Sequence, residues 1–330
     1  KSLHRRTTVN VTIKDTSDLS LAINTSTTQS NKMTTRNYLE VSKEFTRELE
    51  LAIEALNATI NVVGLIATND KPSLAYARAT KKKFNQLGIN YDLRTIPRLE
   101  LEEEITRLNA DSSVHGVFIY FPIFFNHQDD YLRNLVDFRK DIEAGSQYWT
   151  HKLYQNDRFA TNLDTTKKAL LPCTALAIIK ILTAHGIYGE PEMGKPVAGK
   201  VITIFNRSEV IGRPLAVMMS NDGARVYSFD ENGPLVFENA KPQETGISRA
   251  EALISSDIVI TGVPSDKFEK IRPAEITADT VCLNFSSVPN FSEEFEDYPG
   301  TFIPRVGPMT VAMCIRNTVR LFQNFHQVTK

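Results

Sequence analysis

The segment 201–230 combines residue types that could bind a dinucleotide. An apolar run is followed by Asn206-Arg207-Ser208, and Pro214 stands where a helix could begin. Backbone amides at a helix start bind phosphate groups, and Ser208 is a favourable N-cap. A second apolar run ends at Asp230, whose carboxylate could accept hydrogen bonds from both ribose hydroxyls of NAD and would repel the additional phosphate of NADP. The Gly-x-Gly-x-x-Gly pattern is absent, so an ordinary βαβ unit with a surface aspartate remains the alternative.

Helical and strand patterns alternate along the chain and must position this segment. Helices are predicted at 39–56, 73–87, 101–108, 175–184 and 309–326, and strands at 61–67, 91–96, 114–121, 201–205, 226–230, 257–261 and 281–285. Thr174 and Thr310 are expected to cap two of these helices. Because the strands are almost continuously apolar, they indicate parallel sheets covered on both faces. The sequence therefore predicts an α/β protein with two α/β domains flanking a cleft, the C-terminal one a Rossmann-type doubly wound parallel sheet.

The predicted boundaries divide the chain into a tail and two domains. Residues 1–36 are rich in Ser, Thr and Asn and are expected to form a disordered tail. The first domain spans 37–172 and takes in the last helix, 309–330, while the second spans 173–308. Ligands of open parallel sheets bind outside the carboxyl ends of the strands. The candidate binding loops are accordingly 69–76, 120–122, 206–211 and 261–265.

Composition excludes several classes of partner. The 330 residues carry a formal net charge of −1, so neither nucleic acid nor an anionic membrane is expected as a partner. No apolar stretch approaches the ~20 residues that span a bilayer. The three cysteines have neither disulfide-framework nor zinc-site spacing, which favours a reducing compartment and no metal site. A cytoplasmic location is expected, with a mitochondrial one as the alternative if residues 1–36 are a transit peptide.

Six short segments carry a resemblance to a known family. They are Ser73-Leu-Ala-Tyr76, Asp111 to Gly116, Lys140-Asp-Ile-Glu143, Leu171-Pro-Cys-Thr174, Arg207 to Pro214, and Val306 to Met313. In this order and spacing they resemble the methylenetetrahydrofolate dehydrogenase/cyclohydrolase family over roughly residues 37 to 326. The resemblance implies a folate substrate in the cleft, with or without a polyglutamyl tail. It also implies a nicotinamide cofactor in the C-terminal domain and a homodimer.

Departures from the bifunctional pattern of this family narrow the expected activity. Bifunctional members carry a lysine where this chain has Thr80 and a glutamine where it has Tyr120. The lysine is implied to serve ring hydrolysis, which needs proton transfer, whereas hydride removal needs alignment with NAD and no proton acceptor. Glu143 replaces an aspartate and keeps a carboxylate for hydrogen bonds to the pterin. Together with Asp230, these residues resemble monofunctional members that oxidise 5,10-methylenetetrahydrofolate to 5,10-methenyltetrahydrofolate with NAD, cyclohydrolase activity being weak or absent.

The same resemblance implies roles for individual residues. The catalytic positions are Cys173, Tyr76 and Thr80. The folate-binding positions are Tyr76, Tyr120, Pro122, Glu143, Pro308 and Thr310. The NAD-binding positions are Asn206, Arg207, Ser208, Val210, Ile211, Phe229, Asp230, Gly262, Val263 and Pro264.

Two of these residues have an open alternative. Helix amides could lower the thiol pKa of Cys173, but hydride transfer requires no nucleophile, so a small core residue fits equally well. In NADP-using relatives, an arginine at the position of Arg207 can bind the additional phosphate, so Arg207 alone does not specify NAD. In this chain it could instead pair with Asp230 or with a dimer partner.

Other functions remain open at the level of sequence. One is a bifunctional, NADP-dependent dehydrogenase/cyclohydrolase of the same family. Another is a two-domain NAD-dependent dehydrogenase that acts on a small amino or hydroxy acid. A third is an NAD-binding sensor without turnover.

Overall fold

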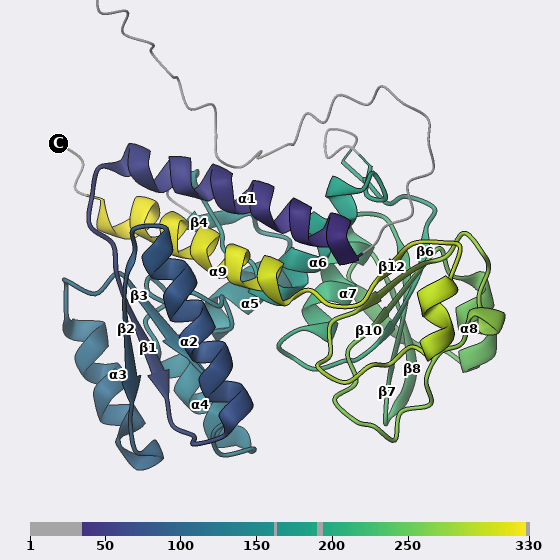
Figure 1. Cartoon of the computed structure of the whole chain (residues 1–330), viewed down its shortest axis with the longest axis horizontal. Coiled ribbons are helices and arrows are strands. Elements are labelled where there is room, and N and C mark those ends of the chain that lie inside the picture. The colour runs from purple at the N-terminus through teal and green to yellow at the C-terminus, as the bar shows by residue number, and fades with distance from the viewer. Residues whose placement is uncertain (1–34, 162–163, 190–193, 328–330) are drawn as a thin grey trace, which may run out of the picture. The chain divides into compact units, whose positions relative to one another are not determined.

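The computed structural model of the chain describes residues 35–161, 164–189 and 194–327 (Figure 1). The predicted tail, as far as residue 34, lies outside the described residues. The first helix, α1, runs from Thr35 to Leu56 and so begins slightly earlier than the helical pattern indicated. No helix of the described ranges is long and apolar enough to cross a membrane.

The N-terminal half forms a three-stranded parallel sheet in the order β2-β1-β3. Its strands are β1 (Asn61–Ile66), β2 (Asn90–Thr95) and β3 (Gly116–Ile119), with α2 (Lys71–Gln86), α3 (Leu101–Ala110) and α4 (His127–Leu135) between and after them. Apolar residues of β1, β3, α3 and α4 form one buried cluster. A single parallel bridge between Val117 and Asp141 brings the segment 140–143 beside β3. The predicted parallel sheet is confirmed, with β3 shorter than expected.

The C-terminal half forms a seven-stranded sheet in the order β12-β11-β10-β6-β7-β8-β9. The strands are β6 (Val201–Phe205), β7 (Arg225–Asp230), β8 (Gly233–Glu238), β9 (Lys241–Glu244), β10 (Ile258–Thr261), β11 (Val281–Asn284) and β12 (Phe302–Ile303). Five of them are parallel, but β8 and β9 are antiparallel. The predicted parallel sheet is confirmed, and two antiparallel strands that were not predicted extend it at this edge. The turn between β7 and β8 is too short for a crossover and can join only antiparallel strands.

Two further helices of this half flank the sheet, α7 (Gly212–Asn221) and α8 (Arg249–Ser255). Two elements that were not predicted lie in the chain after the first sheet and before the second. They are α5 (Gln147–Tyr154) and an antiparallel hairpin of β4 (Phe159–Thr161) and β5 (Asp164–Lys168).

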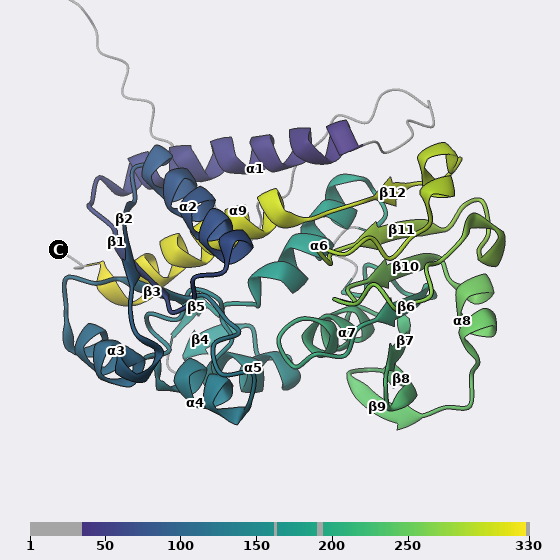
Figure 2. The same ribbon diagram turned by 60° about the horizontal axis from the view of Figure 1, so that its bottom comes forward.

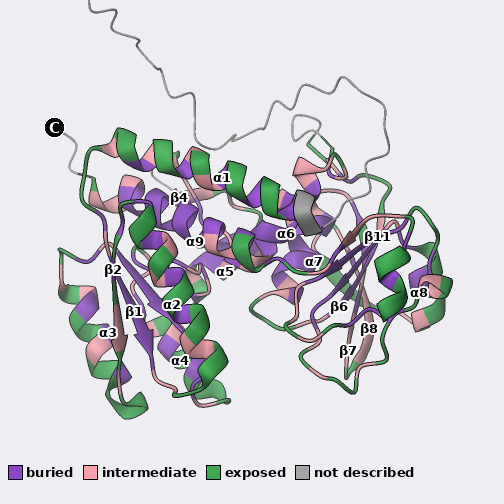
Figure 3. Ribbon diagram, viewed as in Figure 1, coloured by how far each residue is buried: buried purple, intermediate pink, exposed green. Residues whose placement is uncertain are grey.

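The helices α6 (Cys173–Ala184) and α9 (Gly307–Leu321) pack against each other and are largely buried (Figure 3). Helix α9 also packs along α1, as the turned view shows (Figure 2). A π-helical turn, Phe322–His326, extends α9 back to the first sheet, where the Phe322 ring contacts His115. The last helix therefore lies against α1 of the N-terminal half as well as against α6.

The predicted capping residues were wrong for two helices. Helix α6 begins at Cys173 with Pro172 at the N-cap position, so Thr174 lies inside its first turn. In α9 the Thr310 hydroxyl donates back to the Val306 carbonyl, 3.3 Å away, and caps no free amide. Prolines explain both differences, because a proline lacks the amide proton and presets φ for a helix start.

Candidate active site

A cavity of about 580 Å³ lies at the carboxyl ends of strands from both sheets. Twelve of the predicted site residues line it: Tyr76, Tyr120, Pro122, Glu143, Cys173, Asn206, Ser208, Val210, Ile211, Gly262, Pro264 and Thr310. They come from α2, the end of β3, the segment after residue 140, the starts of α6 and α9, and the loops after β6 and β10. Because parallel strands present their loops at one edge, residues far apart in sequence meet here.

Tyr76 and Tyr120 form the wall of the cavity on the side of the first sheet. Their rings meet edge to face at 6.0 Å between centroids. The Tyr120 hydroxyl is buried and hydrogen-bonds to the Tyr91 hydroxyl at 2.7 Å. Burial raises the pKa of Tyr120, so its phenol is neutral at physiological pH. Thr80 is fully buried near Tyr120 and does not line the cavity, so its predicted place at the reacting centre is not supported by its position.

In the segment Lys140-Asp-Ile-Glu143, Lys140 and Asp141 bind other parts of the protein, whereas Glu143 faces the cavity. The Lys140 ammonium donates to the carbonyls of Leu108 and Asn109 at the end of α3. The Asp141 carboxylate accepts from the Ser146 amide at 2.8 Å. Glu143 lines the cavity, and burial together with the charge of Asp141 raises its carboxyl pKa to about 8. This carboxyl is therefore largely protonated at neutral pH in the absence of a ligand.

Cys173 lies at the first residue of α6, against the cavity, but its thiol is not activated. The thiol donates to the Ile142 carbonyl at 3.4 Å, and the Asn317 amide lies 3.3 Å from its sulfur. Burial raises the thiol pKa well above its ordinary value, with Cys314 next to it adding to the effect. The expectation that helix amides could lower this pKa was wrong, because desolvation outweighs the helix dipole here.

The turn after β6 is built to bring backbone amides to the cavity. The Asn206 side chain donates to the Gly262 carbonyl at 2.8 Å and accepts from the Ser208 amide and hydroxyl. The Ser208 hydroxyl accepts from the amides of Ile211 and Gly212, although the N-cap position of α7 is Ile211 and not Ser208 as expected. A Cβ atom on Gly212 would lie 2.0 Å from the Asn206 carbonyl oxygen, so only glycine permits this close approach.

Arg207 and Asp230 form an ion pair with little exposure to solvent. The Arg207 guanidinium donates to the Asp230 carboxylate and to the carbonyls of Ser228 and Gly233 at 2.8 and 2.9 Å. The Asn232 amide also donates to the same carboxylate oxygen of Asp230. The alternative in which Arg207 pairs with Asp230 is therefore the arrangement in this structure. Arg207, Asp230 and the neighbouring Phe229 lie outside the cavity lining, as do Val263 and Pro308.

Several residues that line the cavity were not predicted. Phe285, Ser286 and Ser287 follow β11 directly, so the rule that ligands bind at strand ends could have identified them. Arg133 of α4 also lines the cavity, and no local pattern marks it. Among the residues that the structure describes, no group of three or more His, Cys, Asp or Glu side chains could hold a metal ion.

Two family models match the chain. Residues 37–143 match the catalytic domain of tetrahydrofolate dehydrogenase/cyclohydrolase, and residues 172–326 match the NAD(P)-binding domain of the same family. Both matches contribute residues to the cavity described above.

Individual relatives are similar over most of the chain. The NAD(+)-dependent methylenetetrahydrofolate dehydrogenase of Dictyostelium discoideum is 40% identical over 270 residues, covering 80% of this chain and 86% of the relative. The Saccharomyces cerevisiae protein of the same name is 37% identical over 305 residues, covering 86% and 94%. The solved structure of the NAD-dependent 5,10-methylenetetrahydrofolate dehydrogenase from S. cerevisiae superposes with a TM-score of 0.80 at 36% identity, covering 87% of this chain and 96% of that one. A bifunctional enzyme from Thermoplasma acidophilum, 22% identical with a TM-score of 0.67, shares the fold.

Proposed function

Since the chain belongs to the tetrahydrofolate dehydrogenase/cyclohydrolase family, we propose that it oxidises 5,10-methylenetetrahydrofolate to 5,10-methenyltetrahydrofolate with NAD as hydride acceptor. The observation that carries this proposal is one cavity in which Tyr76, Tyr120 and Glu143 stand opposite the turn after β6. The two tyrosines and Glu143 could bind a pterin, and the turn after β6 could bind a pyrophosphate. Tyr76 offers an aromatic face, and the amides at the start of α7 are donors for an anion.

The residues of this chain are suited to alignment rather than to proton transfer. Removing a hydride from the bridging methylene leaves a cation delocalised over two nitrogens, so no general base is required. NAD, when bound, accepts the hydride. Glu143 accepts hydrogen bonds from the pterin, Tyr76 and Pro122 confine its ring, and Gly262 and Pro264 border the side that faces the nicotinamide. The buried Cys173 thiol supplies packing at this point and no nucleophile.

Hydrolysis of the methenyl product is expected to be weak. Thr80 has no basic group, and Tyr120 is neutral and already bonded to Tyr91. Neither side chain can take a proton from water at neutral pH. The methenyl ring therefore leaves the site unopened.

Selection of NAD over NADP rests on the Arg207–Asp230 pair in this proposal. An arginine at the start of this turn would attract the 2′-phosphate of NADP, but three acceptors in the protein already bind its guanidinium. The Asp230 carboxylate adds repulsion toward a phosphate at this strand end. The pair as a whole disfavours NADP.

The decisive experiment measures methylenetetrahydrofolate oxidation with NAD and NADP in parallel, together with methenyl hydrolysis. The purified protein should form NADH and the methenyl absorbance with NAD, with at least about tenfold lower kcat/KM for NADP. Equal efficiency with both cofactors contradicts the NAD assignment. Oxidation of amino or hydroxy acids but not of folate selects the alternative dehydrogenase, and tight NAD binding without any reduction selects the sensor.

Three further properties extend this proposal. We propose that the substrate is accepted with or without a polyglutamyl tail, that two copies form a homodimer, and that the protein is cytoplasmic. The KM values for mono- and pentaglutamyl substrates test the first property. Light scattering of the purified chain tests the second, and fractionation of cells that express it tests the third.

A further inference from the structure

Arg133 is the one cationic side chain that lines the cavity, among the residues that the structure describes. It belongs to α4, which packs beside α3. Its side chain is only 15% exposed. It makes one ion pair, with the carboxylate of the exposed Asp130. None of the roles proposed above for folate or NAD binding uses this arginine.

Three contacts hold the guanidinium of Arg133 at the cavity wall. Its Nη1 donates to Asp130 at 2.7 Å, and its guanidinium carbon lies 4.4 Å from the centre of the Phe121 ring. Its aliphatic part runs over Gly145, where a Cβ atom would come within 2.8 Å of the Arg133 Cδ. Glycine at 145 thus leaves the space in which this side chain lies, and the charge is fixed in place before any ligand binds.

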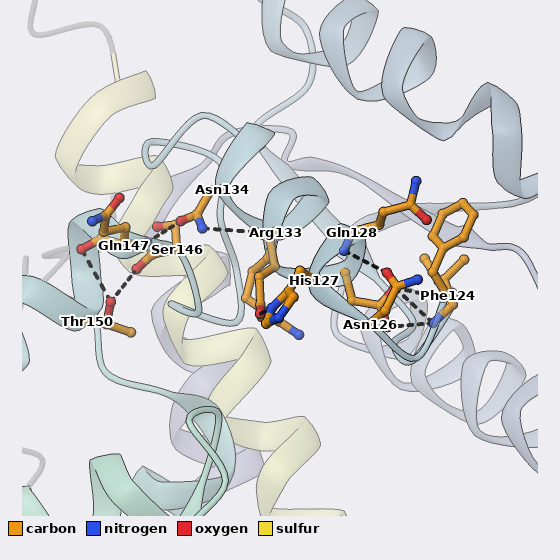
Figure 4. A network of polar contacts seen from close by, with 12 residues as sticks. Phe124, Asn126, His127, Gln128, Arg133, Asn134, Ser146, Gln147 and Thr150 are labelled. Atoms are coloured by element: carbon orange, nitrogen blue, oxygen red, sulfur yellow. Dashed lines mark hydrogen bonds and ion pairs between the residues drawn. The ribbon is translucent and has the colours of Figure 1, made fainter.

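Polar contacts at both ends of α4 fix the helix that carries Arg133 (Figure 4). At its start, the Asn126 side chain accepts from the Gln128 amide at 2.8 Å. At its end, the Asn134 side chain accepts from the Gln147 amide at 2.6 Å, which links α4 to the start of α5. The residue next to Arg133 is therefore tied to the segment that follows Glu143.

Arg133 is close enough to two buried acids to affect their ionisation. Its charge opposes the effect of burial, which raises the pKa of Asp141 and brings that of Glu143 to about 8. Asp141 is occupied by the Ser146 amide, whereas Glu143 faces the cavity. Arg133 acts on Glu143 through space, because the ion pair that it makes is with Asp130.

The other titratable groups near Glu143 stay neutral in the neutral pH range. They are Tyr76 of α2, Tyr91 of β2, Tyr120 after β3 and Cys173 of α6. Burial raises the pKa of the three tyrosines and of Cys173. Arg133 with its partner Asp130, together with Asp141 and Glu143, are therefore the groups that determine the local charge.

We propose that Arg133 is a positioning residue of the folate site, whose charge allows Glu143 to bind the pterin as a carboxylate. A pterin presents a ring N–H and an exocyclic amino group, and the two oxygens of an ionised carboxylate can accept a hydrogen bond from each. A protonated carboxyl carries an O–H donor on one oxygen, so it can accept only one of the two bonds well. Ionising a buried carboxyl requires a compensating charge, and Arg133 supplies it without blocking the carboxylate oxygens. The inference rests on the proposed function, because it assumes a folate substrate.

The test is the pH dependence of folate binding in Arg133→Gln. At pH 7 the KM for methylenetetrahydrofolate should rise roughly tenfold, because more of Glu143 is protonated without the arginine. At pH 9, where the carboxyl ionises in both proteins, the difference should fall to about twofold or less. The KM for NAD should not change at either pH. Arg133→Lys, which keeps the charge, should stay within about threefold of the wild type.

Two further variants make the result specific. Arg139 is the matched control, because it also pairs with a nearby aspartate and lies over a phenylalanine ring, but it does not line the cavity. Arg139→Gln should leave the KM for methylenetetrahydrofolate unchanged. In a Glu143→Gln background, adding Arg133→Gln should produce no pH-dependent change, because the titrating group is gone.

Direct binding of tetrahydrofolate, followed by fluorescence at the same pH values, separates recognition from turnover. A loss of affinity in Arg133→Gln that is equal at pH 7 and pH 9 overturns the inference and makes Arg133 a direct ligand of the substrate. An unchanged KM overturns it as well. If the wild-type protein forms no NADH from methylenetetrahydrofolate, the proposed function fails instead, so the two failures are distinguishable.

Discussion

Arg207 and Asp230 neutralise each other at the end of β7, so the two charges act as one unit on the cofactor. Their side chains are 10% and 17% exposed, which makes their interaction stronger than that of a surface pair. Removing either charge leaves the other without its partner. The same reasoning applies to Glu143, whose ionisation depends on the charges around it rather than on its own residue type.

Asp230→Ser should shift cofactor preference toward NADP. The substitution removes a negative charge and frees an Arg207 guanidinium that can then bind the 2′-phosphate. We expect the ratio of kcat/KM for NADP over NAD to rise at least about tenfold. The double variant Asp230→Ser/Arg207→Ala is the matched control and should lose this gain. An unchanged ratio in the single variant would mean that Asp230 does not face the ribose.

Thr80→Lys alone should not restore methenyl hydrolysis. Thr80 is fully buried, and Tyr120 and Tyr91 bind each other where a lysine would need a partner. The added chain length and charge should lower the free energy of unfolding by about 1–3 kcal/mol. Thr80→Val, of similar size and without charge, is the matched control and should destabilise the protein less than Thr80→Lys, because it removes one buried hydroxyl near Tyr120 and adds no charge. Substantial hydrolysis by Thr80→Lys would contradict this account.

At the scale of elements, α9 connects the two groups of residues that form the cavity wall. Its Asn317 is fully buried and donates to the carbonyls of Ile142 and Leu171, both at 2.9 Å. The first carbonyl belongs to the residue before Glu143, and the second lies two residues before Cys173. The helix therefore fixes both segments through a single amide group, although it contributes only Thr310 to the cavity lining.

Asn317→Ala should destabilise the protein by about 2 kcal/mol, because the Leu171 carbonyl loses the Asn317 donor and the Ile142 carbonyl keeps only the weak thiol donor of Cys173. The KM for folate should rise as well, since Glu143 loses its support. Urea unfolding and steady-state kinetics measure the two effects. Thr318→Val is the matched control: Thr318 is equally buried, but its hydroxyl bonds only to Cys314 within the same helix, so its loss should cost less than about 1 kcal/mol.

The end of α9 should also make stability depend on pH. His115 accepts from the Asn61 amide through Nδ1, and the His326 ring lies 5.3 Å from it. Burial lowers the pKa of both histidines in the folded protein. Their contribution to stability is therefore complete above the unfolded value of about 6.5 and decreases as pH falls below it.

Urea unfolding should show this loss as a lower free energy of unfolding at about pH 5.5 than at about pH 7. His115→Asn keeps an acceptor for the Asn61 amide without titrating, so it should reduce the pH dependence. An equally steep decrease in that variant would assign the effect to other groups.

At the scale of the whole molecule, one cavity receives residues from both sheets. A ligand that contacts both sets of loops binds the folded chain and not the unfolded one, so it stabilises the entire unit. NAD at about one hundred times its Kd should add about 2.7 kcal/mol to the free energy of unfolding. NADP at the same concentration should add much less. Equal thermal shifts with both cofactors would contradict selection by the Arg207–Asp230 pair.

Much of the fold and most of the site could be predicted from the sequence, because the signals are local. Apolar periodicity located the parallel strands of both sheets except the two-residue β12, and the rule for strand ends identified loops that contribute Tyr76, Tyr120, Asn206 and Gly262 to the cavity. The strands β8 and β9 lacked such a signal. Each contains a proline, and neither has the continuous apolar pattern of a buried parallel strand.

The sequence by itself determined most of the long helices and parallel strands and which residue types stand at the ends of those strands, since both depend on neighbouring residues. Only the tertiary structure decided that Arg207 binds Asp230, that the Cys173 thiol is inactive, and that Arg133 lies at the same cavity as Glu143. These properties depend on distance and desolvation between groups far apart in the chain. Packing creates them, because a charge or a thiol acquires its reactivity from whatever the fold places around it.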